Sequence, residues 1–156
     1  MEAARENNDM GKTIMPETDI VPPFNHTGVF TIGTGQPGAP TLKVLLSVPH
    51  NSSTVSGHGT LTQATNPPLQ GNTAFHGVVH TLGLGPAKQI YALTGVPVPP
   101  ALATTYVMQL SIVLDGAWGT KGTATYSYLV GHHPPELPPI REVKDVPVTV
   151  QWLLQE

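Results

Sequence analysis

Residues 104–114 read TTYVMQLSIVL, and apolar side chains occupy every second position from Tyr106 to Leu114. Successive side chains of a strand point to opposite faces of its sheet, so this alternation predicts a strand that turns one face toward a core. By this pattern, the core-facing side chains of the stretch should be Tyr106, Met108, Leu110, Ile112 and Leu114.

Two other stretches repeat the alternation. Residues 41–48, TLKVLLSV, should bury the side chains at 42, 44, 46 and 48. Residues 143–154 alternate through Val148, Val150, Trp152 and Leu154, which predicts that the last stretch is part of the sheet. Pro147 lacks a backbone N–H, so it indicates an edge position or a bulge there.

The whole sequence from Gly28 onward favours strands separated by turns. No stretch of ten or more residues shows sustained helical spacing of apolar side chains. Short, turn-like connections favour antiparallel neighbours. The sequence therefore predicts an all-β fold, an antiparallel β-sandwich of about eight strands, with a flattened closed β-barrel as the alternative. The expected strands are 28–34, 41–48, 53–64, 73–82, 87–94, 104–114, 121–130 and 143–154.

The chain divides by composition into two parts. Residues 1–24 hold seven charged side chains and end at Val21-Pro22-Pro23, which disfavours helix, so they are expected to form a polar, disordered arm. Residues 25–156 are expected to form a single β domain. A chain of this size buries roughly 70% of its unfolded surface and needs no metal or disulfide to fold.

Charge is scarce in the body of the chain and excludes several partners. Only Lys43, Lys88, Asp115, Lys121 and Glu136 lie between residues 25 and 140. Binding to nucleic acid or to an anionic membrane needs clusters of Lys and Arg, so neither partner is expected. Few charges are also available to protect sheet edges, so closure, proline-blocked edges or self-association into a homo-oligomer should protect them.

Cysteine and targeting signals give a further expectation. The sequence has no cysteine, no apolar segment of signal-peptide type and no run of 18 apolar residues. We expect a cytoplasmic protein, with non-classical export left open. No glycine-rich phosphate-binding motif occurs, so no nucleotide cofactor is expected.

Catalysis by paired carboxylates is disfavoured, because Asp115 and Glu136 are the only acids between residues 25 and 140. Ser56-Gly57-His58-Gly59 could contain a catalytic serine and histidine or be a glycine-bulged strand, and no G-x-S-x-G motif supports the first interpretation. The sequence leaves enzyme activity open and favours its absence.

Histidine is the one candidate metal ligand that is abundant relative to the charged residues of this chain. His76 and His80 would point to one face of a strand, with His58 on the strand before, and three imidazoles could hold zinc or copper. However, His76 and His80 would lie about 13 Å apart along an extended strand, which weakens this hypothesis. His132 and His133 are a weaker pair, because adjacent side chains of an extended loop point apart.

Trp118 is the candidate binding residue. It lies in the loop between residues 115 and 121, near an expected sheet end, where it could stack on a sugar or insert into a partner. The alternative is that the indole folds back over the end of the core.

Several short stretches resemble a family of small bacterial proteins known only as a domain of unknown function. The similar segments are Gly28-Val-Phe, Gly38-Ala-Pro-Thr-Leu42, Gly59–Leu69, Leu93-Thr-Gly95 and Gly122-Thr-Ala-Thr-Tyr126, which together span residues 28 to 130. The resemblance implies no activity, cofactor or catalytic residue. The sequence thus favours a non-enzymatic binding or assembly module with a protein or glycan ligand; the alternative is a small His-dependent metal-binding protein or hydrolase.

Overall fold

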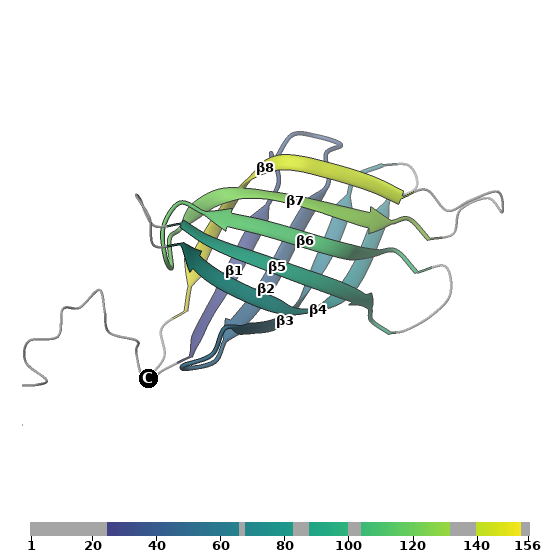
Figure 1. Ribbon diagram of the computed structural model, residues 1–156. Helices are drawn as coiled ribbons and strands as arrows, with labels where there is room; N and C mark the ends of the chain where they lie inside the picture. Colours follow the sequence, from purple (N-terminus) through teal and green to yellow (C-terminus); the bar gives the residue numbers. More distant parts are fainter. Residues whose placement is uncertain (1–24, 66–67, 83–87, 100–103, 132–139, 154–156) are drawn as a thin grey trace, which may run out of the picture.

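The computed structural model describes residues 25–65, 68–82, 88–99, 104–131 and 140–153, and none of these residues lies in a helix (Figure 1). No helix long and apolar enough to cross a membrane occurs among them. The predicted arm, the His132-His133 pair, Glu136 and Leu154 lie outside the described residues. The strands are β1 (His26–Ile32), β2 (Thr41–Val48), β3 (Thr54–Gln63), β4 (Leu69–Leu82), β5 (Lys88–Pro97), β6 (Tyr106–Leu114), β7 (Lys121–Leu129) and β8 (Ile140–Trp152).

The eight strands form one closed barrel in chain order (Figure 1). Each strand pairs antiparallel with the next, and β1 pairs with β8 from Gly28↔Trp152 to Ile32↔Val148. The predicted all-β fold of eight antiparallel strands is confirmed, and of the two architectures that the sequence left open the structure has the closed barrel. Closure pairs β1 with β8, so the two strands that would otherwise form open edges protect each other.

Alternate side chains of every strand fill the barrel interior. Leu42, Val44, Leu46 and Val48 of β2 are all buried, as the alternation predicts. The final strand is part of the sheet, also as predicted, because Val148 and Val150 are buried. An eight-stranded barrel is just wide enough for such side chains to fill it.

The alternation fails in the first part of β6. Val107 is fully buried, whereas Tyr106 and Met108 are only partly buried. The register between β6 and β7 shifts between Val107 and Gln109, which is a β-bulge. An extra residue in one strand moves the following side chains to the other face, so the prediction that Tyr106 and Met108 face the core was wrong.

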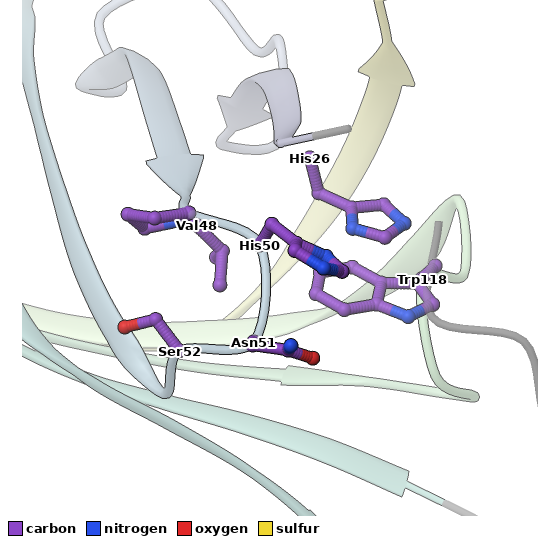
Figure 2. Close-up of a pocket in the computed structure, with 7 residues that line it drawn as sticks. His26, Val48, His50, Asn51, Ser52 and Trp118 are labelled. Atoms are coloured by element: carbon purple, nitrogen blue, oxygen red, sulfur yellow. The ribbon is translucent and has the colours of Figure 1, made fainter. Parts of the chain in front are cut away.

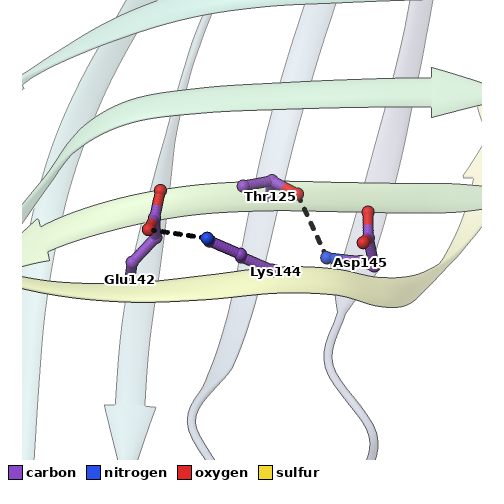
Figure 3. Close-up of polar contacts among 4 residues, drawn as sticks. All are labelled: Thr125, Glu142, Lys144 and Asp145. Atoms are coloured by element: carbon purple, nitrogen blue, oxygen red, sulfur yellow. Dashed lines mark hydrogen bonds and ion pairs between the residues drawn. The ribbon is translucent and has the colours of Figure 1, made fainter.

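A second bulge bends β8 just before Pro147 (Figure 3). The register shifts from Ala124↔Val146 to Tyr126↔Val143, so two residues of β8 oppose Thr125. Asp145 adopts a left-handed conformation with φ 51°, and its N–H donates to Thr125 Oγ1 at 3.1 Å. Lys144 and Glu142 form an exposed ion pair. Pro147 itself lies outside this bulge, in register opposite Thr123 and just past the last β1–β8 pair, Ile32↔Val148.

Inward-facing glycines allow the strands to bend closely over one another. At Gly57, Gly71, Gly77, Gly95 and Gly122, an added Cβ would overlap a backbone carbonyl oxygen of a neighbouring segment. β3 pairs with both neighbours without a register shift. Gly57 and Gly59 therefore mark close approach of the backbone rather than the bulge considered for this segment.

Candidate binding pocket at one end of the barrel

The barrel end at which β1 begins and β8 ends, called here the terminal end, holds the β2–β3 and β6–β7 loops. Trp118 lies in the β6–β7 loop with φ 56°, a left-handed conformation that costs a bulky residue roughly 1–2 kcal/mol. Its backbone N–H donates to Oε1 of buried Gln89 at 3.1 Å. Two further backbone hydrogen bonds, Asp115 N–H to Lys121 O and Gly119 N–H to Gly116 O, close the loop. The loop thus holds Trp118 in its strained conformation.

Aromatic side chains form a continuous cluster from this loop into the core. The His26 imidazole stacks on the Trp118 indole with the ring centroids 3.6 Å apart and the planes 2° from parallel. Trp152 meets Trp118 edge-on at 5.5 Å and donates from Nε1 to Gly119 O at 2.9 Å. Phe30 continues the cluster, with its ring 5.6 Å from Trp152. Trp118 therefore packs back over the end of the core, as in the alternative considered for it.

Trp118 also lines an open pocket (Figure 2). The pocket has a volume of about 200 Å³. Figure 2 shows His26 lying over the indole, with His50 and Asn51 approaching from the β2–β3 loop. The lining residues are His26, Val48, Pro49, His50, Asn51, Ser52 and Trp118, and none of them carries a carboxylate, ammonium or guanidinium group. The pocket therefore combines an aromatic wall with amide, hydroxyl and imidazole groups.

The β2–β3 loop fixes the polar side of the pocket through its backbone. Ser52 N–H donates to Pro49 O at 3.1 Å, and His50 N–H donates to Asn25 Oδ1 at 2.9 Å. Asn51 adopts φ 58°, the left-handed conformation that asparagine tolerates better than most residues. Within the described residues, no hydrogen bond engages the side chains of His26, His50 or Asn51. Their polar atoms are therefore available to solvent or to a ligand.

The family model described as Domain of unknown function (DUF1842) matches residues 26–133. The chain belongs to this family. No curated protein matches the chain. The resemblance inferred over residues 28–130 is thereby confirmed, and the bacterial source that it implies stays a prediction. Every residue that lines the pocket lies within the matched part of this DUF1842 domain.

Burial gives the pocket a pH dependence through His26. Desolvation lowers the pKa of its imidazole below the ordinary value of 6.5. Between the lowered pKa and 6.5 the unfolded chain binds more protons at this residue than the folded one, so His26 should make stability rise with pH across that window. The contribution of His26 to the stability of the fold should be complete above pH 6.5 and should be lost as the pH falls toward the lowered pKa.

An NMR titration of the His26 ring protons should therefore give a midpoint below 6.5. The free energy of unfolding, measured with urea at several pH values, should depend on pH differently in the wild type and in His26→Gln. The difference should be largest within the same pH window. His50 lies across the pocket, so His50→Gln serves as the matched background in which to repeat the titration. A midpoint at or above 6.5 would contradict the prediction.

The three strand histidines of the metal hypothesis lie elsewhere, on the outer face of the barrel. His58, His76 and His80 are all exposed. The register pairs His58 with Ala74 and Ser56 with His76, so His58 and His76 are diagonal neighbours, whereas His80 lies four residues further along β4. The described residues contain no group of three or more His, Cys, Asp or Glu side chains placed to hold a metal ion. A site at these histidines stays a prediction.

Sequence reasoning identified Trp118 and missed His26, His50 and Asn51. One signal was available: antiparallel pairing of the first two strands places His26 opposite Val48, beside the loop that holds His50 and Asn51. The proximity of the β6–β7 loop to this hairpin follows only from the closure of the barrel, because β8 lies between β7 and β1.

Proposed function

We propose that this DUF1842 domain is a non-enzymatic binding module and that its protein or glycan ligand docks at the terminal pocket. One observation carries the proposal. Among the described residues three non-glycine residues have positive φ, and two of them, Asn51 and Trp118, line this single pocket. The left-handed conformation strains a bulky residue such as Trp118, and such strain persists only where surrounding structure imposes it and gathers at binding sites.

The chemistry of the lining supports binding rather than catalysis. None of the lining residues is a carboxylic acid, and Ser52 Oγ is engaged by the Thr54 hydroxyl at 2.7 Å and by the Thr54 N–H at 3.0 Å. A nucleophilic serine would instead need its hydroxyl bonded to a base. An aromatic wall with a few unpaired polar side chains is the usual composition of a ligand pocket.

Arrays of glycans and of peptides, probed with the labelled full chain, test the proposal. Trp118→Gly keeps a residue that adopts positive φ freely and removes the indole, so binding should be lost. Asp145→Gly makes the same kind of change at the β8 bulge, away from the pocket, and should retain binding. The proposal fails if no glycan or peptide binds, or if folded Trp118→Gly, verified by circular dichroism, binds as well as the wild type.

A further inference from the structure

We infer that the ligand of the terminal pocket is a neutral saccharide, bound through one pyranose ring. This inference rests on the proposed function and specifies its ligand. It combines three features of the pocket: the aromatic wall, the neutral hydrogen-bonding groups and the size.

The aromatic wall suits the C–H face of a sugar ring. The π face of an indole is electron-rich, and the C–H groups of a pyranose carry partial positive charge, so the two attract each other. Stacked His26 and edge-on Trp152 hold the Trp118 indole in one orientation, and this preorganisation spares a ligand the cost of ordering the ring. The His26 imidazole covers one face of the indole, so a sugar ring would contact the part of the half-buried indole that still lines the pocket.

The polar groups match hydroxyls rather than ions. The Asn51 amide offers both a donor and an acceptor, as does an imidazole in its neutral form, and every sugar hydroxyl also donates and accepts. The side chains of His26, His50 and Asn51 have these groups unpaired within the described residues. A charged ligand would lose hydration here, and the lining offers it no carboxylate, ammonium or guanidinium group as a partner.

The size of the pocket favours a single ring over a folded partner. Its volume of about 200 Å³ lies below the range typical of drug-sized ligands, roughly 300–1,000 Å³. A stable protein partner would cover roughly 800 Å² of this surface, far more than these seven residues provide. One pyranose ring that contacts the indole and two or three polar side chains uses the pocket as it stands.

The test is a titration of the ¹⁵N-labelled full chain with methyl glycosides of glucose, galactose and N-acetylglucosamine. At least one neutral glycoside should bind saturably in the millimolar range and shift the indole N–H signal of Trp118. Glucuronate and glucosamine, the charged counterparts, should bind more weakly. Asn51→Gly keeps the left-handed backbone and removes the amide, so it should weaken binding about tenfold, the effect of losing one hydrogen bond. Asp145→Gly is the matched control and should bind as the wild type does.

Each other outcome overturns the inference. Failure of all three neutral glycosides to saturate, tighter binding of a charged sugar, or an unchanged affinity in Asn51→Gly would each contradict it. If peptides from the array bind in a Trp118-dependent manner while no neutral glycoside does, the saccharide inference fails and the binding module stands. If neither class binds, both fail.

Discussion

Gly77→Ala is expected to lower the free energy of unfolding by about 3 kcal/mol, the upper part of the range for overpacking a well-packed interior. Gly77 lies in β4 opposite Leu93 of β5. A Cβ added there would lie 2.8 Å from Leu93 Cα and closer still to the Ala92 carbonyl oxygen. Carbon atoms normally approach to about 3.5–4.0 Å. All of these obstacles are backbone atoms, so no side-chain rotation relieves the overlap and β4 must separate from β5.

The control for this prediction is Gly38→Ala in the β1–β2 loop. Gly38 has φ 81° with no heavy atom within 4 Å of an added Cβ, so alanine there meets backbone strain without overlap. That strain alone should cost about 1 kcal/mol. Urea unfolding followed by tryptophan fluorescence measures both variants. A loss in Gly77→Ala no larger than in Gly38→Ala would show that the strands adjust to the methyl group and would contradict the prediction.

The strands could be predicted from the sequence because each one carries its own signal. Alternation identified the buried face of β2 correctly from Leu42 to Val48. It failed at Met108, because a bulge depends on how β6 pairs with β7 and leaves no mark in β6 alone. The choice between barrel and sandwich rested on pairing between β1 and β8, the two most distant strands in the chain. Local patterns do not specify such a pairing.

The candidate site was predictable only in part, for a related reason. Trp118 could be singled out because it lies in a loop near an expected sheet end, where an aromatic side chain can contact a ligand. His58, His76 and His80 were proposed as metal ligands because of their spacing. An even spacing places side chains on the same face of a strand, but it does not say whether that face points into the barrel or out of it. Their exposure places them outside. The stacking of His26 on Trp118 joins β1 to the β6–β7 loop and is visible only in three dimensions.

Gln89→Leu should also lower the free energy of unfolding by about 3 kcal/mol, because the buried Gln89 amide accepts hydrogen bonds from two donors that would otherwise have no partner. Gln89 is a polar side chain inside the barrel with only 1% of its surface exposed. Its Oε1 accepts from the Tyr91 hydroxyl at 2.8 Å and from the Trp118 N–H at 3.1 Å, and its Nε2 donates to Thr81 Oγ1 at 3.4 Å. Burial raises the pKa of Tyr91, so its phenol stays protonated and continues to donate.

Leucine fills a similar volume but accepts no hydrogen bond, so both donors lose their acceptor. A buried donor without a partner costs roughly 1–3 kcal/mol, and Tyr91 is fully buried. The Trp118 N–H loses one of the bonds that hold the β6–β7 loop, so hydrogen exchange at that amide should become faster. Gln89→Leu should consequently also weaken the binding of a ligand in the terminal pocket, although Gln89 does not line the pocket.

Two tyrosine variants separate the hydrogen bond from the volume of the ring. Tyr91→Phe removes a hydroxyl bonded to Gln89 and should cost about 1 kcal/mol. Tyr126→Phe removes a buried hydroxyl that has no hydrogen-bond partner among the described residues, so it should cost nothing or stabilise the barrel. In the double variant Gln89→Leu with Tyr91→Phe, the loss should be smaller than the sum of the two single losses, because no tyrosine hydroxyl then remains unsatisfied. Equal losses in the two tyrosine variants, or an additive double variant, would mean that Gln89 only fills space. In that case another contact, such as the stacking of His26, would have to hold Trp118 in its left-handed conformation.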